Sequence, residues 1–259
     1  MACSGPADNT SPPPSRSSPD RWTLSWQDDF DGASGTAPDS RTWTPELGGG
    51  GWGNEELQTY TDAPENVSLD GRGHLVITAR RSSFDPSVWT SARITTFGKR
   101  TTRHGRVEVR AKVPSGQGIW PAAWTLGQNI QDVGWPASGE IDLIESVGTG
   151  REALQTAHGA RRDGSRWLQT FRSPRGESLS EDFHVYGVEW SSERLQFSID
   201  GRETGVLFRS DLPDDEVWPF DAPQYVLLNV AVGGNLPGAP DATTPPEAPM
   251  LVDWVRAYD

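Results

Sequence analysis

The sequence predicts an all-β fold, either a sandwich or a barrel, built from many short strands. Three observations support this class. Short apolar runs alternate with polar residues, turn-forming residues are frequent (28 Gly and 21 Pro), and no segment shows helical periodicity of useful length. No repeat of fixed period occurs, which argues against a propeller or a solenoid. A chain of 259 residues fits one large all-β domain, and we expect that domain to span residues 21–259.

The predicted strands follow one another along this domain, separated by turns. They cover residues 22–30, 74–80, 104–113, 118–127, 186–191, 194–201, 225–234 and 250–259. The segment at 104–113 is apolar at every second position, so we expect Arg106, Glu108 and Arg110 to share a solvated face. Asp200 and Gly201 form a dipeptide typical of a tight hairpin turn. Strands joined by turns rather than helices leave a sandwich or a barrel as the architecture.

Residues 1–20, MACSGPADNTSPPPSRSSPD, are predicted to form a disordered leader. A polar tract rich in Pro and Ser buries too little apolar surface to offset its ordering entropy. It contains Cys3, the only cysteine, so no internal disulfide can form. Ala-Cys-Ser-Gly before such a tract resembles a bacterial lipoprotein after its signal peptide, which predicts a lipid anchor on Cys3. The alternative is an unmodified tail on a cytosolic protein.

The charge of the chain limits the classes of partner. The formal net charge is −13, from 23 basic and 36 acidic residues, which argues against nucleic acid and against anionic membranes. The same balance mildly disfavours a sulfated polysaccharide, although a local basic groove could override it. No stretch approaches the roughly 20 apolar residues that a membrane helix needs.

The stretch GEIDLIES, residues 139–146, places three carboxylates in what otherwise reads as a strand. On a helix, Glu140, Asp142 and Glu145 would share no face. On a regular strand, Glu140 and Asp142 share a face, whereas Glu145 points away. A β-bulge between Asp142 and Glu145 shifts the alternation by one residue and returns Glu145 to the side of the other two. We therefore predict a bulged strand with all three carboxylates on one face.

This arrangement suits the hydrolysis of a glycosidic bond. The two glutamates are then about 13 Å apart along the backbone. Side chains that lean together can approach the roughly 5–5.5 Å of a retaining glycosidase, whereas an inverting enzyme leaves a wider gap. Glu140 would be the ionised nucleophile and Glu145 the acid and then the base. Three neighbouring carboxylates cannot all ionise cheaply, so the cluster should hold a proton at a raised pKa.

Three other interpretations of the acidic stretch remain open. It could be a solvated strand edge, although the irregular spacing does not suit a solvent face. It could bind a divalent metal ion, although no histidine pattern such as HExxH lies nearby. A non-catalytic sugar-binding sandwich would suit the 12 tryptophans but does not need three carboxylates.

The surrounding segments resemble family 16 glycoside hydrolases, in the laminarinase-like form of endo-β-1,3-glucanases. The resemblance covers about residues 22–259, in the order GWGNEELQTYT (51–61), GRVEVRAKVPSGQGIWPAAWTLG (105–127), WPASGEIDLIESVG (135–148), DFHVYGVEW (182–190), NVAVGGNLPGAPD (229–241) and MLVDWVRAYD (250–259). The resemblance implies a β-jelly roll, two curved antiparallel sheets with a sugar groove on the concave face. It also implies retention, with Glu140 as nucleophile, Asp142 as its helper and Glu145 as acid/base.

Flat aromatic rings complement the apolar faces of sugars, and several tryptophans are placed to do this. Trp120 and Trp124 are four residues apart, hence on one face of a regular strand, and by resemblance they line the donor subsites. Core packing is the alternative for both. Trp135 precedes the acidic strand and is expected to wall the same cleft, unless it is structural.

Polar residues complete the predicted sugar site. Asn54 lies in the Gly-rich loop at 48–56, and the resemblance makes it a sugar contact, with turn formation as the alternative. Arg93 is a weaker candidate for bonding sugar hydroxyls. The resemblance places His158 near the acid/base side, while a core histidine is the alternative. We expect His184 to be structural.

Two further features concern subsites and metal. Many relatives carry Trp where this chain has Leu236, which puts subsite detail and chain-length preference in question. Relatives also often carry a structural calcium on the convex side. Asp253 matches one ligand position, and Asp29 and the backbone carbonyl of Gly73 are weaker matches, so the predicted metal is structural. We expect no cofactor for catalysis.

The sequence thus predicts an extracellular, retaining endo-glycosidase that cuts β-1,3-glucan such as laminarin, and a monomer. The polysaccharide is its expected partner. The same residues would also serve a transglycosylase, or an enzyme acting on mixed-linkage glucan, agar or carrageenan. A glucan-binding module without turnover is the remaining alternative.

Overall fold

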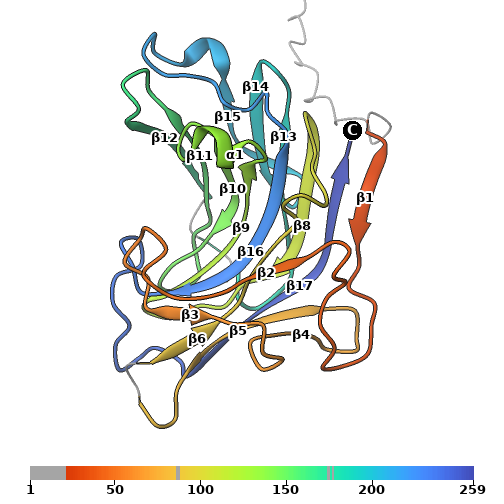
Figure 1. The fold of residues 1–259 in the computed structure, drawn as a ribbon, viewed down its shortest axis with the longest axis vertical. Coiled ribbons are helices and arrows are strands. Elements are labelled where there is room, and N and C mark those ends of the chain that lie inside the picture. The colour runs from red at the N-terminus through yellow and green to blue at the C-terminus, as the bar shows by residue number, and fades with distance from the viewer. Residues whose placement is uncertain (1–21, 86–87, 174–175, 177) are drawn as a thin grey trace, which may run out of the picture.

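The alternating apolar pattern folds into strands of two β-sheets, as the computed structural model shows (Figure 1). The inner side chains of the two sheets pack together in a hydrophobic core. The structure describes residues 22–85, 88–173, 176 and 178–259. The predicted leader and Cys3 lie outside the described residues, so the domain boundary at residue 21 stays a prediction.

Among the described residues, the first sheet has ten strands. They are β1 (Leu24–Asp28), β3 (Gln58–Tyr60), β4 (Val67–Leu69), β5 (Leu75–Arg81), β6 (Trp89–Ser91), β8 (Gly105–Lys112), β13 (His184–Trp190), β14 (Arg194–Ile199), β15 (Arg202–Phe208) and β17 (Glu247–Tyr258). Their order is β15-β14-β13-β8-β17-β5-β6-β3, with β1 beside β17 and β4 beside β5. The β3–β6 pair is parallel, and the pairs around β8 and β17 are antiparallel.

Over the same part of the chain, the second sheet has seven strands, and it carries the acidic stretch near its centre. They are β2 (Thr44–Glu46), β7 (Arg93–Thr95), β9 (Ile119–Gly127), β10 (Glu140–Glu145), β11 (Leu154–Ala160), β12 (Arg166–Arg172) and β16 (Gln224–Val232), in the order β12-β11-β10-β9-β16-β7-β2. Within the described ranges the helices are short, α1 (Ile130–Val133) and the 3-10 turn η2 (Arg209–Asp211). None of these helices has the length and apolar character needed to cross a membrane.

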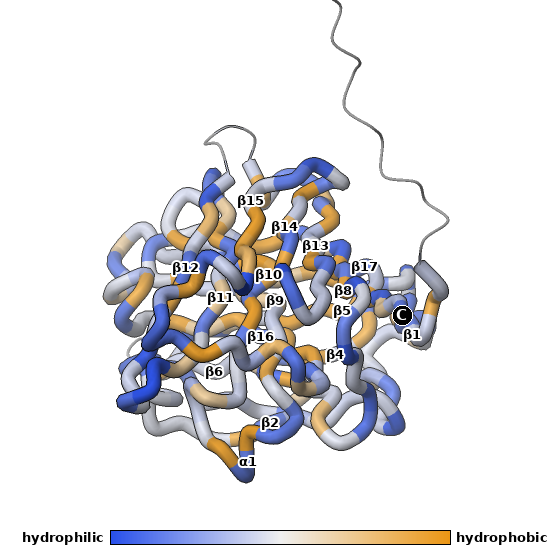
Figure 2. The backbone as a smooth tube through the Cα atoms, turned by 90° about the horizontal axis from the view of Figure 1, so that it is seen from above, coloured by the Kyte–Doolittle hydropathy of each residue, from blue (hydrophilic) through white to orange (hydrophobic). Residues whose placement is uncertain are grey.

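One hydrophobic core joins the two sheets. Apolar stretches recur along the inner strands in Figure 2. Strands of both sheets supply fully buried side chains to this core, among them Ile77, Val109, Ile141, Leu228 and Val252. Burying an aliphatic side chain stabilises the fold by about 1.5–3 kcal/mol, so the inner faces hold the two sheets together. The all-β sandwich predicted from the sequence is confirmed.

All eight predicted strand segments contain a strand, with ends that differ by a few residues. The predicted hairpin is also confirmed, since Asp200 and Gly201 both have positive φ and join β14 to β15. The solvated face predicted for β8 is wrong at Glu108, which is buried. β8 lies between β13 and β17, and Arg106 pairs with the Glu108 carboxylate there.

The predicted bulge is present in β10. Leu143 and Ile144 together oppose the single residue Gln155 of β11, and the register with β9 shifts at the same place. Both bulged side chains are fully buried in the core. The Gln155 side chain, itself 1% exposed, donates from Nε2 to the Leu143 carbonyl at 2.8 Å and to the Ser198 carbonyl at 3.2 Å. Gln155 therefore satisfies a carbonyl that the bulge removes from regular pairing.

We predict that Gln155→Leu destabilises the fold by about 1–3 kcal/mol, because it leaves buried carbonyls without their donor. Urea unfolding would measure this. The matched control is Gln169→Leu on β12, where the glutamine is exposed, and it should change the free energy of unfolding by less than about 0.5 kcal/mol. Equal stabilities of the two variants would contradict a role for Gln155 in supporting the bulge.

Candidate active site

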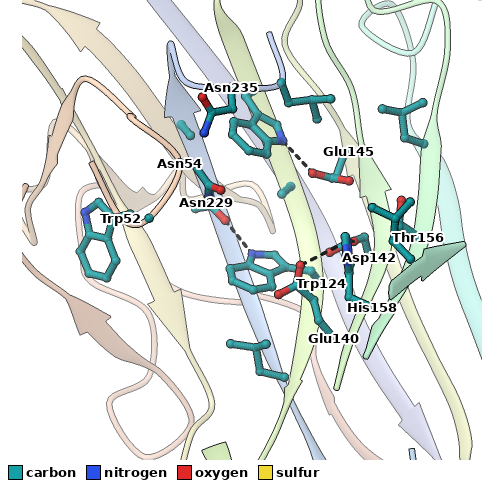
Figure 3. Close-up of a pocket in the computed structure, with 18 of the residues that line it drawn as sticks. Trp52, Asn54, Trp124, Glu140, Asp142, Glu145, Thr156, His158, Asn229 and Asn235 are labelled. Carbon is teal, nitrogen blue, oxygen red and sulfur yellow. Dashed lines mark hydrogen bonds and ion pairs between the residues drawn. The ribbon is translucent and has the colours of Figure 1, made fainter. Parts of the chain in front are cut away.

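The bulged strand brings Glu140, Asp142 and Glu145 to one groove of about 770 Å³ (Figure 3). Asp142 lies between Trp124 of β9 and Thr156 of β11 in the sheet register. Four positions of β9 separate the partners of Glu140 and Glu145, which are Leu126 and Ala122. The structure thus brings together the three carboxylates predicted from the sequence, and the bulge directs Glu145 into the groove.

Each outer carboxylate accepts a hydrogen bond from an indole. Trp135 Nε1 donates to Glu140 Oε2 at 2.9 Å, and Trp120 Nε1 donates to Glu145 Oε1 at 2.9 Å. An indole N–H can only donate, so each contact fixes one carboxylate oxygen. Both tryptophans line the groove and are only partly buried, so core packing does not describe them. Trp135 is 47% exposed, and the Arg166 guanidinium lies 5.7 Å from its ring centre.

His158 lies at the Glu140 end of the trio. It pairs with Glu140 in the register of β10 and β11. Its Nε2 lies 3.1 Å from Asp142 Oδ2 and 3.6 Å from Glu140 Oε1. This differs from the predicted position near the acid/base residue Glu145. The reason is the strand register, which places Leu154 opposite Glu145.

The same histidine completes a group that could hold a metal ion. Glu140, Asp142 and His158 each offer a ligand atom, and these atoms lie within 4.8 Å of one another. The sequence could not show this group, because His158 comes from the next strand. In the structure these atoms already have partners, since His158 Nε2 contacts Asp142 and the Trp135 indole donates to Glu140.

Burial dominates the electrostatics of the trio. Asp142 is 3% exposed, and loss of solvation raises the pKa of its carboxyl to about 8. Burial, and then the charge of Asp142, raise the pKa of Glu140 and of Glu145 to about 8. His158 and the indole donors act in the opposite direction on both glutamates. Near neutral pH the cluster therefore keeps protons as well as negative charge, and it titrates as a unit.

One wall of the groove is aromatic and partly cationic. Trp124 packs on a small apolar cluster of Leu126, Tyr225 and Leu227, and its Nε1 donates to Asn229 Oδ1 at 2.7 Å. The Arg93 guanidinium lies 4.8 Å from the Trp124 ring centre, and its Nε donates to Glu46.

Arg93 also approaches the tryptophan of the Gly-rich loop. Its guanidinium lies 4.7 Å from the ring centre of Trp52. It lines the groove as predicted, but two rings and one carboxylate occupy much of its surface. A direct bond from Arg93 to sugar stays a prediction.

The Gly-rich loop holds Asn54 at the rim of the groove. Asn54 Nδ2 donates to Glu56 Oε1 at 3.1 Å, and its carbonyl accepts from the amide of Asn235 at 2.9 Å. Gly234 lies so close that an added Cβ would be 2.8 Å from the Asn54 carbonyl oxygen and 3.3 Å from the Trp120 ring. The two loops and Trp120 therefore form one packed unit. Leu236 also lines the groove and is 42% exposed.

Sequence reasoning missed several groove residues. They are Trp52, Asn229 and Asn235 on the aromatic side, and Leu154, Thr156, Arg166, Leu168, Thr170 and Arg172 on β11 and β12. Trp52 and Asn235 could have been predicted from the sequence, because both adjoin glycines in loops that flank predicted site residues. The sequence offered no comparable feature for β12, because this exposed edge strand shows no regular alternation of buried and exposed residues.

The three residues proposed for calcium differ in their surroundings. A Cβ added to Gly73 would lie 3.9 Å from the Asp29 carbonyl oxygen and 3.9 Å from Asp31 Oδ1. These are oxygen donors of the kind that calcium takes. Asp253 instead pairs with Arg110, and the Asp29 carboxylate accepts from Arg256 at 3.1 Å. Gly73 and the Asp29 carbonyl thus fit a calcium site better than Asp253 does.

We predict that Asp142→Asn stabilises the protein as the pH rises. The pKa of the Asp142 carboxyl is about 8 in the folded protein, against 3.8 as the ordinary value. Between these values the unfolded state binds fewer protons, so the parent loses stability with rising pH. Asparagine does not titrate, so the variant does not lose stability in this way. Its gain in free energy of unfolding over the parent should be larger at pH 8 than at pH 4, by about 2 kcal/mol or more.

Urea unfolding at both pH values measures this difference. Glu65→Gln, at an exposed carboxylate that does not line the groove, is the control and should show no such gain. A pH-independent difference for Asp142→Asn would refute the effect of burial.

Comparisons with known proteins agree with this geometry. The profile of glycosyl hydrolases family 16 matches residues 54–256. A beta-glucanase of Rhodothermus marinus is 38% identical over 254 residues, covering 92% of this chain and 85% of that protein. A glucan endo-1,3-beta-glucosidase of Cryptopygus antarcticus is 37% identical over 233 residues, covering 84% and 83%. The laminarinase catalytic domain of Thermotoga maritima MSB8 has a TM-score of 0.82 and 41% identity, covering 92% and 98%. The chain therefore belongs to glycosyl hydrolases family 16 and is a glycoside hydrolase.

Proposed function

We propose that this glycoside hydrolase cuts internal bonds of β-1,3-glucan, such as laminarin, with retention of anomeric configuration. The observation that carries the proposal is the bulge of β10, which directs the buried Asp142 and the partly buried Glu140 and Glu145 into one groove beside an aromatic wall. The beta-glucanase and the endo-1,3-beta-glucosidase among its relatives support the choice of substrate. The net charge of −13 favours a neutral polymer over a sulfated one.

In the proposed reaction, Glu140 attacks the anomeric carbon while Glu145 gives its proton to the departing glycosidic oxygen. The sugar is then held as a glycosyl ester of Glu140. Glu145, now ionised, takes a proton from water, and the resulting hydroxide replaces Glu140 at the anomeric carbon. Both carboxyl groups return to their starting states. The Trp135 and Trp120 indoles hold one oxygen of each carboxylate, which leaves the other oxygen for chemistry.

The raised pKa values of the trio support the acid role. A general acid must carry a proton near neutral pH, and burial keeps the pKa of Glu145 at about 8. Burial raises the pKa of Glu140 to about 8 as well, against the opposing effects of His158 and the Trp135 indole, so we assign Glu140 as the nucleophile from its place in the acidic motif and not from its pKa. Asp142 lies between them and contacts His158, so we assign it the role of helper to the nucleophile.

The groove is asymmetric on either side of the trio. β9, β16 and the Gly-rich loop bring tryptophan and asparagine, whereas β11 and β12 bring threonine, leucine and arginine. We assign the donor sugars to the tryptophan side, following the sequence prediction for Trp120 and Trp124. The acceptor sugars then lie over Thr156 and Thr170, whose hydroxyl oxygens are 3.2 Å apart.

Location and assembly are proposals as well. An extracellular or cell-surface enzyme suits a polymeric substrate, and lipid modification of Cys3 would anchor it there. We also propose that the enzyme acts as a monomer, as the sequence analysis expects.

We predict that Glu140→Ser retains laminarin binding and loses turnover by about 10⁴-fold or more, because the nucleophile is removed. A reducing-sugar assay measures turnover, and calorimetry with a laminarin oligosaccharide measures binding. The control is Glu65→Gln, which should keep parent activity. A Glu140→Ser enzyme as active as the parent would disprove the nucleophile assignment.

The same assay separates the competing functions. Binding by the parent without release of reducing ends would support a glucan-binding module. Larger products after addition of an acceptor sugar would support a transglycosylase, and proton NMR of the first product reports retention or inversion. Full turnover in EDTA would argue against a catalytic metal at Glu140, Asp142 and His158.

We also propose a structural calcium at the Asp29 carbonyl and Gly73, supported by the facing Asp31 carboxylate. Calcium at about 100 times its dissociation constant would add about 2.7 kcal/mol of stability. The melting temperature should then rise by roughly 5–10 °C relative to EDTA, at about 2–4 °C per kcal/mol. Asp31→Asn should weaken that response, and identical melting curves in calcium and EDTA would rule the site out.

A further inference from the structure

We propose that Tyr60 is a positioning residue for Trp124, acting through a chain of hydrogen bonds that runs from Trp124 through Asn229 and Tyr60 to Glu56. Glu56 also holds Asn54, so the chain would join two parts of the donor wall that are far apart in the sequence. This inference rests on the proposed function, because it takes Trp124 and Asn54 to contact glucan.

The chain consists of three short steps. Trp124 Nε1 donates to Asn229 Oδ1 at 2.7 Å, Asn229 Nδ2 donates to the Tyr60 hydroxyl at 3.0 Å, and that hydroxyl donates to Glu56 Oε2 at 3.2 Å. Figure 3 shows the bond between Trp124 and Asn229 as a dashed line. Tyr60 belongs to β3 of the ten-stranded sheet, whereas Asn229 belongs to β16 of the seven-stranded sheet. The chain therefore crosses from one sheet to the other.

The chemistry of the groups allows this chain one direction only. An indole N–H only donates, so the oxygen of Asn229 must face Trp124 and its nitrogen must face Tyr60. The hydroxyl of Tyr60 then accepts from Asn229 and has one proton left, which it gives to the Glu56 carboxylate. Each bond polarises the next, and the chain ends on an acceptor that can carry a full negative charge.

Burial keeps this direction fixed. Tyr60 is 1% exposed and Asn229 is 6% exposed, so water does not readily replace either partner. Loss of solvation, and then the Glu56 charge, raise the pKa of Tyr60 well above its usual value. The hydroxyl consequently keeps its proton wherever the protein is folded. Without that hydroxyl, the Asn229 amide nitrogen would lose its acceptor, and only the Trp124 indole N–H would still hold the amide oxygen in place.

Glu56 is the junction between this chain and the Gly-rich loop. Its Oε1 accepts from Asn54 at 3.1 Å, while its Oε2 accepts from Tyr60 and from Gln58 Nε2, the latter at 2.6 Å. Gln58 in turn accepts at Oε1 from the amide of Val232 at 2.7 Å. The loop that bears Asn54 and the strand that holds Asn229 are thus fixed to one carboxylate.

Besides its packing on the apolar cluster, two contacts restrain the Trp124 ring. The Arg93 guanidinium, 4.8 Å from the ring centre, restrains the tilt of the ring. The bond to Asn229 restrains rotation of the ring within its own plane. Loss of the second restraint should weaken sugar stacking without altering the carboxylates of β10. The expected signature is a change in KM rather than in kcat.

Tyr60→Phe tests this inference, because it removes the hydroxyl and keeps the ring. On laminarin oligosaccharides we expect KM to rise about 3- to 10-fold, the value of one buried hydrogen bond, with kcat within about twofold of the parent. The matched control is Tyr186→Phe, at a tyrosine buried in β13 whose hydroxyl has no hydrogen-bond partner among the described residues. It should leave both constants unchanged.

A double-mutant cycle with Trp124→Phe shows whether Tyr60 acts through the indole. Phenylalanine cannot donate to Asn229, so Tyr60→Phe should add less than about twofold to KM in that background. Glu56→Gln should also raise KM, since one of its two acceptor oxygens is lost, and it serves if Tyr60→Phe folds poorly. Melting curves identify any variant that fails to fold.

An unchanged KM for Tyr60→Phe, or a full additional rise in the Trp124→Phe background, would overturn the inference. A parent enzyme that does not cleave laminarin oligosaccharides would instead refute the proposed function. The two failures are therefore distinguishable.

Discussion

A carbonyl removed from regular pairing inside a buried sheet must find another donor, and the bulge of β10 creates that need at Leu143. Gln155 meets it from the neighbouring strand, with its side chain buried between the sheets. The rest of the site depends on this local solution. It lets two consecutive apolar residues enter the core while the next residue, Glu145, returns to the groove. A regular strand would place Glu145 in the core, where an unpaired charge is expensive.

The carboxylates then face a second constraint, which is the loss of water around them. Burial favours their protonated forms, while indole N–H groups and His158 favour the charged forms. Burial and these contacts act against each other without cancelling, so protons and negative charge coexist on a few neighbouring carboxyl groups. Such a cluster is costly for folding and useful for chemistry, because acid and nucleophile functions need opposite protonation states.

Much of this arrangement could be predicted from the sequence, because the alternation of apolar and polar residues shows which side chains share a face of a strand. The irregular spacing of Glu140, Asp142 and Glu145 predicted the bulge, and the four-residue spacing of Trp120 and Trp124 predicted their common face. The position of His158 was predicted wrongly, because strand register depends on pairing across the sheet. Gln155 and Tyr60 were missed for a related reason. A buried polar residue is recognisable only once its partners on other strands are known.

The short strands were also beyond prediction. Three-residue strands such as β3 and β7 show no usable period, yet they carry Tyr60 and Arg93. The Glu108 carboxylate was expected in solvent for a similar reason, since alternation identifies two faces without showing what covers the second one. The local pattern of residues therefore predicted the acidic strand β10 well and the residues that support it poorly.

The edge position of β12 has a consequence for how this scaffold can diversify. Among the described strands β12 pairs with β11 alone, and its groove-facing residues Leu168, Thr170 and Arg172 remain at least partly open to water. Replacing them would disturb few core contacts, whereas replacing Trp124 or Asn229 would disturb a network spanning both sheets. Under the proposed placement of donor and acceptor sugars, preference for the leaving portion of a polymer can thus drift, or be engineered, at little risk to folding. Under the same placement, preference for the retained portion is tied to the architecture itself.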